Sequence, residues 1–86
     1  MYSVILDDKI IEDLEKLRQE IIAQIRAKIY DHLAHHPREL GKRLQGPHKG
    51  LYSYRHGNYR IIYRIFVDKK TIVINSIGHR SEVYKI

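Results

Sequence analysis

The chain has 86 residues, of which 43% are hydrophobic and 30% charged, a balance typical of a folded domain rather than a disordered segment. It contains no cysteine, which excludes disulfide bridges and cysteine-based zinc sites. No apolar run approaches the roughly 18–20 residues that span a membrane, and the N-terminal segment turns acidic at Asp7 instead of carrying a basic signal region. We therefore expect one soluble, cytoplasmic domain over residues 1–86.

The net charge of +6 is concentrated in the second part of the chain. Residues 1–36 contain seven acidic and five basic residues, whereas residues 37–86 contain three acidic and eleven basic ones. Such an excess of positive charge suits a polyanionic partner, most often a nucleic acid, and a solvated basic surface is the alternative interpretation.

The first part of the chain predicts one short strand and two helices. Residues 2–6 form a β-type run that ends at Asp7 and Asp8, which can cap a helix. From there to His36 the chain has no Gly or Pro, and apolar residues recur at helical spacing. One helix of this length would measure about 43 Å, longer than the roughly 30 Å width of a compact domain of this size. We therefore expect a helical hairpin that turns around residues 18–20.

The second part changes from helical spacing to the alternation of strands. Pro37 is expected to end the second helix, and residues 38–50 to form a basic connector. Strands are predicted over residues 51–55, 59–67 and 71–77, with Gly78 ending the last one before a polar tail. The predicted fold class is α+β: an N-terminal strand, a helical hairpin and a three-stranded antiparallel meander, with the helices packed on one face of the sheet.

The long strand over residues 59–67 separates its side chains by face. One face carries Tyr59, Ile61, Tyr63, Ile65 and Val67, and the other carries Arg60, Ile62, Arg64 and Phe66. The first set is the more apolar and is expected under the helices. The two arginines are then expected on the opposite, open face, where a ligand can reach them.

Several catalytic chemistries lack the residues that they need. Gly41 and Lys42 lack the earlier glycine of a phosphate-binding loop. In the cluster of three histidines only His32 and His36 have the spacing for shared metal ligation, and surface histidines are the favoured interpretation. The second part has too few carboxylates for a two-metal nuclease. We therefore expect no metal site and no cofactor.

Metal-free cleavage of RNA, with the ribose 2′-hydroxyl as internal nucleophile, remains possible. It needs a base, an acid and a cation that stabilises the phosphorane, and Arg, His and Tyr side chains can fill these roles. The candidates in the last strands and the tail are Arg55, Arg60, His79, Arg80 and Tyr84. Candidates for RNA binding are Arg43 and Lys49, with Tyr52 and Tyr54 as stacking surfaces for bases. The alternative is that these arginines pair with acidic residues of the helices and that the tyrosines pack in the core.

Two motifs resemble the RelE/ParE superfamily of toxins from prokaryotic toxin–antitoxin operons. They are residues 57–64, GNYRIIYR, and residues 77–84, IGHRSEVY. The connector over residues 44–52 and the order of the elements are also similar, so that the resemblance covers nearly the whole chain. The tail is more similar to the RelE branch, which implies an mRNA endonuclease acting in the ribosomal A site. The alternative is a ParE-like, non-hydrolytic poison of DNA gyrase, although that branch generally lacks the His-Arg pair with a terminal tyrosine.

The resemblance also implies roles for individual residues. Arg60 takes the position of the family's transition-state arginine, and Arg55 that of an arginine on the preceding strand. The family's tail residues fall on His79, Arg80 and Tyr84. Some RelE enzymes carry two strand lysines where this chain has Leu51 and Ser53, which removes part of their catalytic set.

The missing lysines leave proton transfer to other side chains. Histidine titrates near neutrality, and a tyrosine near cations ionises more readily, so His79 and Tyr84 are expected to share the acid and base roles. Which of them is the base stays open. The expected partners are mRNA on the ribosome and a small, partly acidic antitoxin encoded beside the toxin. We expect the free toxin to be a monomer that forms a hetero-oligomer with this antitoxin.

Overall fold

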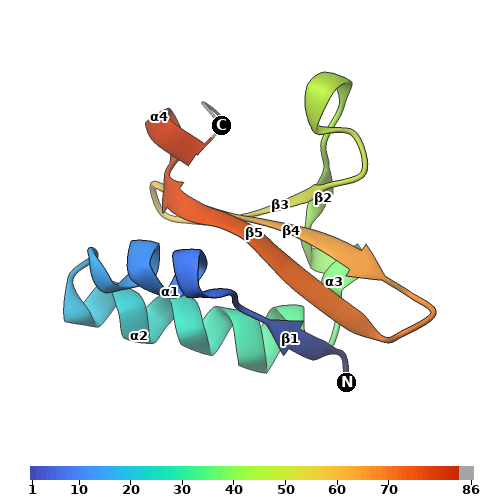
Figure 1. The fold of residues 1–86 in the computed structure, drawn as a ribbon, viewed down its shortest axis with the longest axis horizontal. Helices are drawn as coiled ribbons and strands as arrows, with labels where there is room; N and C mark the ends of the chain where they lie inside the picture. The colour runs from blue at the N-terminus through green and yellow to red at the C-terminus, as the bar shows by residue number, and fades with distance from the viewer. Residues whose placement is uncertain (84–86) are drawn as a thin grey trace.

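The chain builds one sheet with two helices across one of its faces (Figure 1). The structure is a computed structural model that describes residues 1–83, so that Tyr84 lies outside the described residues. The first elements are β1 (Ser3–Ile5), α1 (Asp8–Glu15), α2 (Gln19–Lys28), the π-helical turn η1 (Ile29–Leu33) and α3 (Pro37–Leu40). They are followed by β2 (Lys42–Arg43), the 3-10 turn η2 (Gly46–His48), β3 (Tyr52–His56), β4 (Tyr59–Phe66), β5 (Thr71–His79) and α4 (Arg80–Val83).

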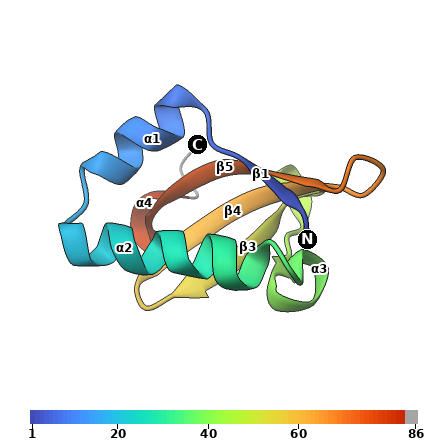
Figure 2. The ribbon, with the colours of Figure 1, turned by 90° about the horizontal axis from the view of Figure 1, so that it is seen from below.

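The strand order within the described residues is β1-β5-β4-β3-β2. Strand β1 pairs with β5 in parallel, and the other neighbours are antiparallel. Figure 2 shows α1 and α2 joined at one end and diverging from each other across one face, and Figure 1 shows α4 rising from the end of β5 on the opposite face. The predicted α+β class, the helical hairpin and the meander are confirmed, and β1 and β2 extend the meander to five strands.

The helical hairpin begins and turns where the sequence predicts. Asp7 caps α1, because its side chain accepts a hydrogen bond of 2.9 Å from the backbone N–H of Ile10. Helix α1 ends at Glu15, and α2 begins after its N-cap residue Arg18. The apolar stripes of both helices then pack on the sheet in one core, together with η1. Its fully buried side chains include Leu14, Ile25, Ile29, Leu33, Ile61, Tyr63, Ile72 and Ile74.

The second helix ends before Pro37, as predicted: α2 passes into the π-helical turn η1, which ends at Leu33, and the backbone of His36 is not helical. Pro37 then begins the separate helix α3, where its missing N–H removes no helical hydrogen bond. Two local expectations were wrong. The connector over residues 38–50 contains a strand, because Lys42 and Arg43 pair with β3. Gly78 does not end β5, because it pairs with Arg60 and the strand continues to His79.

A buried tyrosine joins the sheet to α3. The hydroxyl of Tyr63 donates a hydrogen bond of 2.6 Å to the carbonyl of Pro37, and the Tyr63 ring stacks on Tyr52 with ring centroids 5.7 Å apart. A side chain at Gly41 would overlap the Tyr63 hydroxyl. These contacts fix the segment that leads into β2 against the middle of β4.

One extra residue changes the side-chain alternation of β5. Ile62 pairs with Ser76 and Tyr63 pairs with Ile74, so that Asn75 has no partner on β4 and forms a β-bulge. An insertion of one residue exchanges the two faces for every later residue of the strand. The bulge therefore decides which faces Gly78 and His79 occupy.

Candidate functional site

Two arginines and a glycine form a row across the open face of the sheet. Arg55 pairs with Arg60, and Arg60 pairs with Gly78 on its other side. Residues that pair across strands project to the same face. The neighbours Ile61 and Tyr63 are buried in the core beneath the helices, so the arginine row lies on the face away from α1 and α2. The expected orientation of Arg60 is confirmed.

The side chain of Arg60 is held beside the β3–β4 turn. It is partly buried, and its Nη1 donates to the carbonyl of Tyr59 at 3.2 Å and to that of Gly57 at 3.5 Å. Arg55 is exposed. A Cβ atom at Gly78 would have no other atom within 4 Å, so there is open space beside Arg60. This space and the two guanidinium groups can accommodate a phosphate.

The strands contribute basic side chains, and no acidic ones, to the open face. Strands β2 to β5 contain no Asp or Glu. Lys42 joins this face because it pairs with Ser53, which in turn pairs with Ile62 of the open face. The four cations that strands β2 to β4 place on the open face are Lys42, Arg55, Arg60 and Arg64. Lys42 was absent from the sequence-based candidates, because only the pairing of β2 with β3 assigns it to a face.

The structure does not place His79 on the arginine face. His79 pairs with Tyr59, which lies on the helix side of the sheet by the alternation of β4. The two rings meet edge to face, with their centroids 6.1 Å apart. His79 also lines a cavity of about 580 Å³ to which α1 contributes Lys9, Asp13 and Lys16. The expectation that His79 gathers with Arg55 and Arg60 is therefore not met.

Arg80 lies at the same end of the sheet as the arginine row. Its backbone N–H donates a hydrogen bond of 2.8 Å to the carbonyl of Asn58, in the β3–β4 turn two residues before Arg60. Arg80 is the first residue of α4, which stands on the open face (Figure 1). The structure thus brings Arg55, Arg60 and the start of α4 together.

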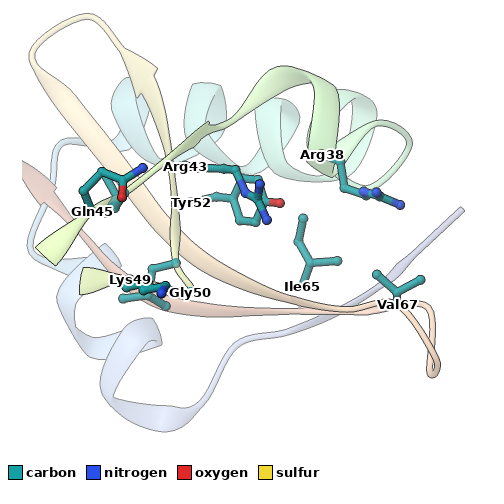
Figure 3. A pocket seen from close by; sticks show the side chains of 10 residues that line it. Arg38, Arg43, Gln45, Lys49, Gly50, Tyr52, Ile65 and Val67 are labelled. Carbon is teal, nitrogen blue, oxygen red and sulfur yellow. The ribbon is translucent and has the colours of Figure 1, made fainter. Parts of the chain in front are cut away.

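The residues expected to bind RNA occupy a different region. Tyr54 lies on the helix-facing side of β3 and packs against the core, which corrects the expectation that it stacks on bases. Tyr52 also faces this side, and it lines a cavity of about 510 Å³ with Arg43 and Lys49 (Figure 3). Arg38 of α3 completes the ring of cations around this cavity. Arg38 was absent from the sequence-based candidates, because residues 38–50 were expected to form a connector and not the helix α3.

Neither a metal site nor a membrane-spanning helix occurs in the described part of the chain. No three His, Cys, Asp or Glu side chains of residues 1–83 gather closely enough to hold a metal ion. His32, His35 and His36 are all exposed. No helix in this part of the chain combines the length and the apolar character needed to cross a membrane.

Comparison with known proteins places these features in a family. Residues 4–84 match the family described as the ParE toxin of type II toxin–antitoxin system, parDE. The chain is 36% identical over 73 residues to toxin RelG of Mycobacterium tuberculosis, covering 85% of this chain and 84% of that protein. It is 32% identical over 85 residues to toxin RelE of the same organism, covering 99% and 88%.

Solved structures show the same fold. The chain superposes with a TM-score of 0.87 and 34% identity on a chain of the toxin–antitoxin complex RelBE2 from Mycobacterium tuberculosis, covering 92% of this chain and 98% of that one. With the isolated RelE toxin of E. coli the TM-score is 0.76 and the identity 26%, covering 99% and 93%.

Proposed function

We infer that this chain, a toxin of RelE type, is an endoribonuclease that cleaves mRNA on the ribosome and so inhibits translation. It belongs to the ParE toxin family of type II toxin–antitoxin systems. The observation that carries this proposal is the row of Arg55, Arg60 and Gly78 on strands that contain no carboxylates. Two cations beside open space suit a phosphodiester, and the absence of carboxylates from these strands suits a reaction that uses the 2′-hydroxyl.

In this mechanism the two arginines bind the scissile phosphate. The 2′-oxygen attacks the phosphorus, the bond to the 5′-oxygen breaks, and the products are a 2′,3′-cyclic phosphate and a 5′-hydroxyl. Arg60 and Arg55 stabilise the charge that develops on the phosphorane, with Arg80 contributing from the start of α4. Arginine stays protonated at any working pH, so these side chains do not transfer the protons.

Proton transfer falls to the tail of the chain. His79 and Tyr84 are the residues whose chemistry suits it, but His79 occupies the helix-facing side of the sheet. We propose that the ionised hydroxyl of Tyr84 takes the proton from the 2′-hydroxyl, and that the resulting neutral Tyr84 returns this proton to the departing 5′-oxygen. Cations close to a tyrosine hydroxyl favour its ionised form.

RNA outside the cleaved bond has a separate binding region in this proposal. The cavity lined by Arg38, Arg43, Lys49 and Tyr52 carries three cations around a partly apolar floor (Figure 3). Arg43 and Tyr52 lie on the face of the sheet opposite to the arginine row. Contacts of the three cations with phosphates strengthen binding without taking part in the reaction.

A cognate antitoxin is the second proposed partner. Similar chains have been solved as RelBE complexes from Mycobacterium tuberculosis and from Pyrococcus horikoshii. A segment with acidic side chains would complement the basic open face and keep RNA away from it. We propose that the free toxin is a single-domain, cytoplasmic monomer that forms a hetero-oligomer with this antitoxin.

The proposal is tested with purified toxin and programmed ribosomes. We expect the wild type to cleave the mRNA and leave a 5′-hydroxyl and a 2′,3′-cyclic phosphate, and Arg60→Ala to lower the cleavage rate by about 10²–10³-fold, the usual loss for a donor that stabilises developing charge. Arg26→Ala is the matched control, because Arg26 is an exposed arginine of α2 on the other side of the sheet. A 5′-phosphate product would show that water is the nucleophile and would overturn this mechanism.

The family match also favours a second candidate function. The matched family is described by its ParE toxin, and a toxin of the ParE branch is expected to poison DNA gyrase. Induced cells distinguish the two. An arrest of protein synthesis before any DNA damage supports mRNA cleavage, whereas DNA damage with continued translation supports the gyrase activity.

A further inference from the structure

We propose that His79 is a positioning residue that caps helix α4 and so holds Arg80 at the arginine face, and that it is neither the acid nor the base of the reaction. The proposal rests on the proposed RNA cleavage for its consequence, although the cap itself is a feature of the fold. It begins from three groups around the His79 ring: Ser81, Tyr59 and helix α1.

The ring of His79 lies across the sheet from the reacting phosphate. His56, Tyr59 and His79 pair in a row, next to the row of Arg55, Arg60 and Gly78. Adjacent residues of a strand project to opposite faces, and the side chain of His56 confirms the assignment, because its Nε2 lies 2.9 Å from Oε1 of Gln24 on α2. The register therefore assigns the His79 side chain to the face of the sheet opposite to that of Arg60.

The contacts of Nδ1 are those of a helix N-cap. His79 precedes the first residue of α4, and its Nδ1 accepts a hydrogen bond of 3.3 Å from the backbone N–H of Ser81, the second residue of the helix. Nδ1 also lies 2.9 Å from the hydroxyl of Ser81. A backbone N–H can only donate, so Nδ1 must be unprotonated to accept it. The structure therefore assigns the tautomer with the proton on Nε2.

The Tyr59 ring contacts the capping ring, and helix α1 lines the cavity beside it. The edge of the Tyr59 ring meets the His79 ring at an interplanar angle of 77°. The charged groups of α1 that line the same cavity are Lys9, Asp13 and Lys16, and Lys16 lies 3.8 Å from the carboxylate of Asp13. A second proton on His79 would occupy Nδ1 and remove the acceptor that the Ser81 N–H uses.

The cap acts on catalysis through Arg80. The backbone N–H of Arg80 bonds to Asn58 in the turn that also holds the Arg60 side chain. A helix of four residues has little stability of its own. Its orientation over the open face therefore depends on the bonds at its first turn. Loss of the cap frees α4 and lets Arg80 leave the phosphate site.

The loss of cleavage rate in variants of His79 distinguishes a capping role from proton transfer. Asparagine is a strong N-cap residue but cannot exchange a proton near neutrality, so His79→Asn is expected to cleave mRNA at close to the wild-type rate. The cleavage rate of His79→Ala should fall about fivefold, because loss of the cap lowers the fraction of molecules with α4 in place by about that factor. A general acid or base would lose 10²–10⁴-fold in both variants, and that outcome overturns the proposal. His56→Ala, the matched histidine of the same row, should have no effect on the rate.

Two measurements do not depend on activity. The imidazole ¹⁵N shifts of His79 should show an unprotonated Nδ1, and the Ser81 amide should exchange its hydrogen about fivefold faster in His79→Ala than in the wild type or in His79→Asn. Equal exchange in all three proteins contradicts the cap. If the wild type does not cleave RNA, the proposed function fails, while these measurements still decide the cap. Thermal unfolding of each variant shows that the fold is intact.

Discussion

Arg55 and Arg60 occupy directly opposite positions on β3 and β4, and strands β2 to β5 carry no acidic residue that could neutralise their charges. Like charges opposite each other in a sheet destabilise the pairing. A bound anion reverses this, because a phosphate between two guanidinium groups forms charge-assisted hydrogen bonds with both. The pair is therefore better suited to binding an anion than to stabilising the free protein.

The first prediction is that removing one charge of this pair stabilises the free protein. Arg55→Gln should raise the midpoint of thermal unfolding by about 1–8 °C at low salt, since relief of roughly 0.2–1 kcal/mol of repulsion shifts a domain of this size by that amount. The gain should shrink at high salt, where the charges are screened. Arg26→Gln on α2 is the control. A lower midpoint for Arg55→Gln would mean that the arginine makes stabilising contacts that offset the repulsion.

The open space beside Arg60 gives a second prediction. Gly78→Val fills this space with a side chain that suits a strand, so its thermal stability should equal or exceed that of the wild type. The rate of mRNA cleavage should nevertheless fall by about 10²-fold, because the phosphate can no longer approach Arg60 correctly. The measurements are thermal unfolding and single-turnover cleavage. Full activity in Gly78→Val would place the reacting phosphate elsewhere.

The basic cavity beside α3 gives a third prediction, which concerns binding alone. Arg43→Ala and Lys49→Ala should each weaken ribosome binding and reduce the slope of log K against log salt by about 1, while the rate at saturating ribosome concentration stays unchanged. Lys28→Ala on α2 is the control for a general loss of charge. A lower saturated rate with unchanged affinity would assign these residues to the reaction instead.

The buried hydroxyl of Tyr63 gives a fourth prediction, for stability. Tyr63→Phe leaves the carbonyl of Pro37 without its 2.6 Å donor, and the free energy of unfolding should fall by about 1–3 kcal/mol. Tyr30→Phe is the control, because Tyr30 is exposed. An unchanged stability in Tyr63→Phe would show that water replaces the hydroxyl at Pro37.

The same hydroxyl makes stability depend on alkaline pH. Burial, assisted by the nearby Tyr52, Tyr54 and Glu39, raises the pKa of Tyr63 far above its usual value. The unfolded chain therefore loses this proton first, and the contribution of neutral Tyr63 is intact below about pH 10 and declines as the pH rises further. Denaturant unfolding between about pH 9 and 11 should show a smaller decline in Tyr63→Phe than in the wild type. An identical decline in both proteins would contradict the raised pKa.

The sequence by itself determined the main elements and their order: the first strand, the two helices of the hairpin and the three strands of the meander. Helical spacing without Gly or Pro, the capping residue Asp7 and the excessive length of a single helix located the hairpin. The two-residue alternation located β3, β4 and β5 and placed Arg60 opposite the core residues of its own strand. These features were predictable because they depend on residues close to each other in the chain.

Only the tertiary structure decided how the strands combine. The partners of β1 and β2 depend on pairing between distant segments, and a two-residue strand such as β2 leaves no periodic pattern. The bulge at Asn75 is a further case: uninterrupted alternation from Ile74 would have placed His79 with the arginines. The alternation of side chains along one strand predicts which of its residues share a face. The register between strands is set by their packing. For that reason Arg60 was placed correctly from the sequence and His79 was not.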